Sequence, residues 1–197
     1  MMTMQRPRTV ARLVAALACA VAALPALACG LEDPSSIAMQ RGVLNLAYPQ
    51  SLYVGTAVWQ AQAAGKLPRD PLAQQGDLTP EARAALRMLR AGSLLRQFSA
   101  KLAEPAAAPH APLAVVLLGP VMWNRFEFDG SAVRPTLHAA GPQPGDVVVV
   151  TDVAVIEAIG LGTLTLAEAL QTGLMRLYGS AAEVAAVTGW LAGGSGG

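Results

Sequence analysis

The sequence predicts an α+β protein, in which an N-terminal helical region precedes a small, mostly antiparallel sheet covered by C-terminal helices. Two observations predict this class. Apolar residues recur at helical spacing through the first half, and from Leu113 the pattern changes to short β-like runs. Capped helices return after four consecutive valines. We therefore expect a helical region at 29–105, an α+β domain at 112–192 and a flexible tail at 193–197.

The first 28 residues have the pattern of a signal peptide. Three arginines precede an uncharged apolar run at 13–24, and the small residues Ala26 and Ala28 stand where a signal peptidase cleaves. A run of about a dozen residues is too short to cross a bilayer core of roughly 30 Å as a permanent helix. We expect export to the periplasm or cell envelope, the alternative being an anchor helix that stays in place.

Cleavage would leave 169 of the 197 residues, with 11 basic residues against 13 acidic ones once the three arginines are lost. That length suffices for one domain with a core, and that charge does not favour nucleic acid as a partner. Cys19 lies inside the signal and Cys29 would be the first mature residue, so no internal disulfide can form. Lipidation of Cys29 would tether the protein to a membrane. Ordinary cleavage that leaves a thiol stays open, because Ala26 stands where lipoprotein signals usually carry Leu.

Three helices are expected in the helical region. The first begins at Asp33-Pro34 and ends at Pro49, the second spans 51–64, and the third runs from Thr79-Pro80 to Leu102. The third helix carries four arginines, which we interpret as a solvated face because no phosphate loop or aromatic platform accompanies them. They are Arg83, Arg87, Arg90 and Arg96.

Four strands are expected next, at 113–118, 122–128, 133–139 and 146–151. Pro135 places the third at a sheet edge or a bulge, and the valines of the fourth indicate burial on both faces. Helices follow at 153–159, 166–171 and 181–191. The last two begin with capping boxes, Thr165 with Glu168 and Ser180 with Glu183.

The segment GDVVVVTDVAVIEAIGLGTLTLAEALQTGLMRLYGS resembles part of the sterol carrier protein type 2 fold, the non-specific lipid-transfer domain. The likeness covers about 80 residues and lies in the order of elements: a buried strand, a helix capped by Thr151 and Asp152, a second capped helix and a strand with a glycine at each end, Gly173 and Gly179. It implies a hydrophobic tunnel between the sheet and the helices from Val153 to Leu191. It also implies an apolar or lipid-like ligand and specifies no reaction.

Five apolar residues are the candidate ligand contacts in such a tunnel: Trp123, Phe126, Phe128, Met175 and Tyr178. The alternative is that they fill the core. In that case the protein would be a structural or accessory protein of an envelope complex, with a filled interior and a possible tether through Cys29. For the helical region both roles stay open, as a lid over the tunnel or as a separate partner-binding element.

The sequence contains little that could support catalysis. Only two histidines, His110 and His138, are present, and neither has the spacing of a metal site. The G-x-S-x-G and C-x-x-C-H motifs are absent, and Gly160-Leu161-Gly162 follows a helix where a dinucleotide loop would follow a strand. We therefore expect no enzyme, no cofactor and no metal. Catalysis would merit reconsideration only if His138, Asp152 or Glu157 met in a cleft.

Overall fold

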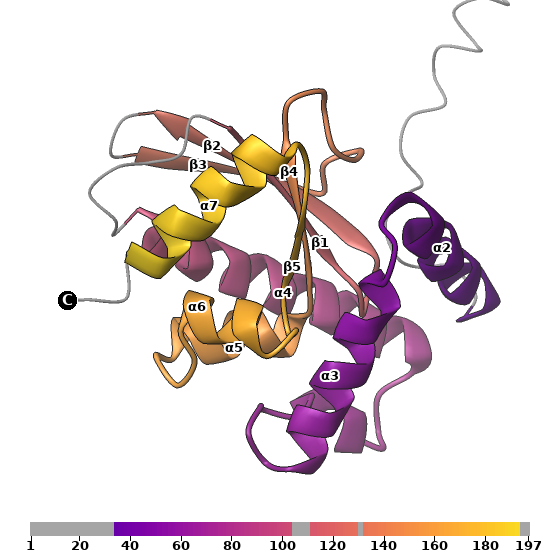
Figure 1. Cartoon of the computed structure of the whole chain (residues 1–197). Coiled ribbons are helices and arrows are strands. Elements are labelled where there is room, and N and C mark those ends of the chain that lie inside the picture. The colour runs from indigo at the N-terminus through magenta and orange to yellow at the C-terminus, as the bar shows by residue number, and fades with distance from the viewer. Residues whose placement is uncertain (1–33, 104–110, 130–131, 194–197) are drawn as a thin grey trace, which may run out of the picture.

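The computed structural model describes residues 34–103, 111–129 and 132–193 (Figure 1). The predicted signal segment, Cys29, His110 and most of the predicted tail lie outside these ranges. The architecture is α+β, with N-terminal helices, a mixed sheet and C-terminal helices, which confirms the predicted class. Within the described residues, no helix combines the length and the apolar character needed to cross a membrane.

The elements follow the predicted order closely. The first group comprises the helices α2 (Pro34–Ala47), α3 (Ser51–Ala63) and α4 (Pro80–Leu102), with a short 3-10 helix η1 (Pro71–Gln74) before α4. The strands are β1 (Leu113–Leu117), β2 (Met122–Asp129), β3 (Ala132–Leu137) and β4 (Val147–Thr151). The chain ends with α5 (Val153–Gly160), α6 (Leu166–Gln171), β5 (Arg176–Tyr178) and α7 (Ala181–Gly193).

The five strands form one sheet in the order β3-β2-β1-β4-β5. Only β1 and β4 are parallel, and the other three pairings are antiparallel. β3 lies at an edge, where Pro135 is tolerated because its missing N–H breaks no inner ladder. β4 is buried along its whole length, as its valines predict. Because β1 and β4 are parallel neighbours, their carboxyl ends lie side by side at the same end of the strands.

Local side-chain caps explain where several helices begin. The Thr79 side chain accepts a hydrogen bond from the backbone N–H of Ala82 at 3.2 Å, with Pro80 in the first turn of α4. Both predicted capping boxes form. Thr165 and Glu168 satisfy each other's backbone N–H groups at the start of α6, and Ser180 and Glu183 do the same before α7.

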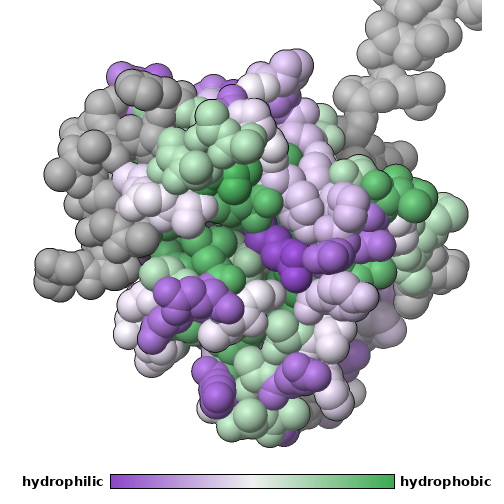
Figure 2. Space-filling view, viewed as in Figure 1, coloured by the Kyte–Doolittle hydropathy of each residue, from purple (hydrophilic) through white to green (hydrophobic). Residues whose placement is uncertain are grey.

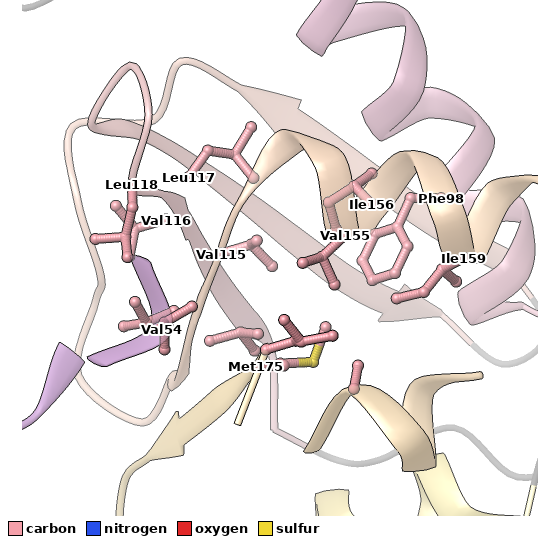
Figure 3. Close-up of a cluster of buried hydrophobic side chains, with 14 of the residues drawn as sticks. Val54, Phe98, Val115, Val116, Leu117, Leu118, Val155, Ile156, Ile159 and Met175 are labelled. Atoms are coloured by element: carbon pink, nitrogen blue, oxygen red, sulfur yellow. The ribbon is translucent and has the colours of Figure 1, made fainter. Parts of the chain in front are cut away.

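A single hydrophobic core joins the helical region to the sheet. Alternation along β1 places Val115 on one face and Val116 on the other. On the first face, Phe98 of α4 meets Phe126 edge to face, with ring centroids 5.8 Å apart. On the second face, Val54 of α3 lies beside Val116 and is fully buried (Figure 3). The N-terminal helices are therefore part of the folded core.

Candidate ligand-binding site

The five predicted ligand contacts lie on both faces of the sheet. Phe126 and Met175 are 0% and 2% exposed, so both are packed inside the core. The ring of Phe128 lies 5.2 Å from that of Trp190, on the face that Phe126 occupies. These three residues act in the structure as packing residues.

Trp123 and Tyr178 lie on the opposite face, because the strand register pairs them with Val116 and Val148. Both rings contact Tyr48, at centroid distances of 6.0 and 5.3 Å. None of the five predicted contacts lines either pocket described below. Their role in ligand binding stays a prediction.

A pocket of about 350 Å³ opens at the carboxyl ends of β1 and β4. It lies among α2, α4, the start of α5 and the loop at 68–70. A second pocket of about 510 Å³ extends from it along α3. The two pockets share Arg41, Gln62, Gly119 and Asp152. In open sheets that contain parallel strands, the crevice beyond the carboxyl ends of those strands is a common ligand site.

Asp152 stands between the two pockets, directly after β4. Its carboxylate caps α5 by accepting a hydrogen bond from the Ala154 N–H at 3.4 Å, and it accepts another from the Gly119 N–H at 3.0 Å. Burial raises the pKa of Asp152, while these hydrogen bonds and the nearby Arg41 guanidinium oppose the rise. A carboxyl with a raised pKa inside a pocket is a candidate for ligand contact as well as a structural cap.

Arg41 reaches the same loop from α2. Its Nε donates to the Leu118 carbonyl at 2.7 Å, and its Nη2 donates to the Gly119 carbonyl at 2.6 Å. Gly119 is therefore held by Arg41 through its carbonyl and by Asp152 through its N–H. A Cβ at this position would lie 3.3 Å from Asp152 Oδ2, a tight contact that the carboxylate could relieve only by shifting. These contacts fix the wall between the two pockets.

Charged pairs from α4 form the rim of the first pocket. Arg87 pairs with Asp70 at 2.6 Å, and Arg90 pairs with Glu157 of α5. Arg83 donates to two loop carbonyls and so fixes the segment before α4. Arg87 and Arg96 are exposed, as a solvated face predicts, but Arg83, Arg87 and Arg90 also have partners outside α4, in the preceding loop or on α5. Helical spacing alone does not reveal such partners.

The pocket contains two of the three residues that would reopen the question of catalysis. Asp152 and Glu157 both line it. His138 lies elsewhere, after β3 at a φ of 57°, where its backbone N–H donates to Asn124 Oδ1 at 3.3 Å. No three His, Cys, Asp or Glu side chains converge as metal ligands anywhere in the described ranges. The arrangement of apolar lining and charged rim is suited to holding a molecule with one apolar and one polar end.

Comparisons with known proteins give a partial likeness in fold. No protein-family model matches the chain, and no curated protein matches it. The chain is similar to sterol carrier protein 2 like 2 from Aedes aegypti, with 22% identity over 52% of this chain and 94% of that one and a TM-score of 0.34. It is also similar to the ubiquinone synthesis protein UbiJ-SCP2, with 17% identity, coverages of 56% and 99%, and a TM-score of 0.32. Both are sterol carrier structures.

The resemblance predicted from the sequence is thus found among solved structures. A third similar structure is the stereoselective inverting sec-alkylsulfatase Pisa1 from Pseudomonas sp., with 15% identity, a TM-score of 0.33 and coverage of 47% of this chain. The chain spans only 14% of that enzyme's length. Likenesses at these scores do not identify a ligand or a reaction, so the proposals below rest on the chain's own residues.

Proposed function

We propose that this protein is an exported envelope protein that binds an apolar or lipid-like small molecule, without catalysis, at the carboxyl ends of β1 and β4. The observation that carries the proposal is the pocket of about 350 Å³, which has a mainly apolar lining and a charged rim. Its volume falls in the range of small-molecule sites, roughly 300–1,000 Å³. Ile37, Met88 and Val153 supply apolar surface from three different helices.

The charges around the pocket favour a ligand whose polar end is neutral or anionic. Four arginines and three carboxylates line the site. Two of the arginines are paired with two of the carboxylates, and these charges cancel. The lining then retains two arginines, Arg41 and Arg69, and one carboxylate, Asp152. A fatty acid has the required combination of an apolar chain and an anionic end.

Export and tethering are part of the proposal on sequence grounds. The residues at 1–28 have the pattern of a cleavable signal, and Cys29 directly follows it. Mass spectrometry of the protein purified from cells would test both points. We expect a mature N-terminus at Cys29, with an acyl-glyceryl mass if the cysteine is lipidated and an unmodified mass if it is not.

The binding test uses decanoate and decanol, which share one chain length and differ at the polar end. Isothermal titration should show binding of both, with decanoate tighter because of the arginines. Ala84→Trp, on the pocket side of α4, should abolish binding by filling the site. Ala85→Trp, one residue further and exposed, is the matched control and should bind normally. Unchanged binding in Ala84→Trp would overturn the assignment of the site.

An accessory role in an envelope complex is the second candidate. The observation in its favour is that two of the five predicted tunnel residues, Phe126 and Met175, are buried in the packed core and leave no free surface for a ligand. Binding of neither probe, together with stoichiometric co-purification of one envelope protein, would favour this role. Extraction of a bound apolar compound from the purified protein would favour the carrier.

A further inference from the structure

The helical hairpin formed by α2 and α3 has an unusual charge pattern. From residue 34 to residue 64, Arg41 is the only charged side chain. It is turned inward, where it donates to the carbonyls of Leu118 and Gly119. The outer face of the hairpin therefore carries no charge, whereas solvated helix faces ordinarily do.

Large apolar side chains occupy this outer face. Met39, Val43 and Leu46 follow one another at helical spacing on α2 and are 68%, 61% and 82% exposed. Figure 2 shows hydrophobic surface over α2. On α3, Tyr53 and Trp59 are 63% and 68% exposed. We call these five residues the outer hairpin face.

The inner side of the hairpin is fixed to the sheet. The Tyr178 hydroxyl donates to the Pro49 carbonyl at 2.8 Å, and Arg176 Nη1 donates to Gln50 Oε1 at 2.8 Å. Leu44 and Val54 are buried against the core. These contacts hold the hairpin against the sheet. The core-facing sides of α2 and α3 are therefore already packed, and only the outer hairpin face is free for another partner.

We propose that the outer hairpin face docks on the surface of a lipid bilayer. An uncharged apolar helix face with Trp and Tyr fits the boundary between acyl chains and headgroups, where both aromatic residues are enriched. The position of α2 supports this occupant. Its first residue, Pro34, is five residues after Cys29, so an acyl anchor at Cys29 would hold the start of α2 within about 18 Å of the membrane.

Docking would place the second pocket beside the membrane, because Trp59 both belongs to the outer hairpin face and lines that pocket. A ligand could then enter from the bilayer. The docking itself does not depend on the pocket holding a ligand, so the two proposals fail separately.

The test uses residues 29–197 with Cys29→Ser, which keeps every described element and cannot carry an acyl chain. We expect this protein to co-sediment with phosphatidylcholine vesicles, and added salt at about 0.5 M should not weaken binding because no charge takes part. Tryptophan emission should shift to shorter wavelength on binding, and Trp59→Phe should remove most of the shift. Val43→Glu with Leu46→Glu should lower vesicle partition at least about tenfold.

The matched control is Leu161→Glu, at an apolar residue that is 68% exposed and lies outside the hairpin. It should bind vesicles like the parent. Equal losses in both variants, or no binding by the unlipidated parent, would overturn the proposal. A second copy of the chain would be the occupant instead if the parent is a dimer without lipid and the Val43/Leu46 variant is a monomer. Thermal unfolding of each variant verifies that the fold is retained.

Discussion

Replacement of Asp152 by alanine tests whether this side chain holds the pocket wall together. The substitution removes the cap of α5, which is worth about 1 kcal/mol in typical helices. It also leaves the part-buried Gly119 N–H without its acceptor, at a cost of about 1–2 kcal/mol. Relief from holding a carboxylate in a buried position offsets part of this sum.

We therefore expect Asp152→Ala to lower the free energy of unfolding by roughly 2 kcal/mol near neutral pH. For a chain of this size, the melting temperature should fall by about 4–8 °C. Differential scanning calorimetry and urea titration measure both quantities. The control is Asp129→Ala, which removes an exposed carboxylate paired with Arg134 and should change stability little. An Asp152→Ala protein as stable as the parent would refute the role given to this residue.

The raised pKa of Asp152 also predicts the direction in which the stability of the fold changes with pH. Burial raises the pKa of Asp152 in the folded protein, so folding favours the protonated form. The part of the folding free energy that comes from protonation of Asp152 is complete below the ordinary pKa of 3.8 and is lost as the pH rises through the raised value. Asp152→Asn cannot ionise and should lack this loss. The stability difference between the parent and Asp152→Asn should therefore shift in favour of the variant as the pH rises across this window.

Two further predictions concern packing and capping. Phe126→Ala should lower the unfolding free energy by about 3–5 kcal/mol in urea titration, because the ring is fully buried against Phe98, and a change near zero would contradict the packed core. Hydrogen bonds from Thr165 lower the pKa of Glu168, so the stabilisation is present above the ordinary pKa of 4.5 and is lost as the pH falls. Glu168→Gln should therefore flatten the acid limb of the stability curve, and an unchanged limb would exclude this contribution.

Local signals in the sequence predicted most elements of the fold. The capping boxes at Thr165 and Ser180 involve residues three positions apart, so their partners can be read from the chain itself. The valines of β4 indicated burial on both faces, and Pro135 indicated an edge strand. These features depend on side-chain chemistry and backbone geometry over a few residues, which explains why they were predictable.

The candidate site was not predicted because it depends on contacts between distant segments. Arg41 and Leu118 are 77 positions apart, and the pairing of Arg90 with Glu157 spans 67 positions. The parallel alignment of β1 and β4, which creates the crevice, is likewise not encoded by any local motif. The five aromatic and Met candidates were chosen by residue type, whereas strand register places Phe126 and Tyr178 on opposite faces.

The most direct test of the carrier proposal is a methyl NMR titration of the protein with ¹³C-labelled methionine methyl groups. Met88 lines the pocket at the carboxyl ends of β1 and β4, and Met175 lies in the core beneath the sheet. We expect decanoate to shift the Met88 methyl signal in a saturable manner and to leave the Met175 signal in place. Saturable movement of Met175 with Met88 unchanged, or no movement of either signal, would contradict the assignment of the site.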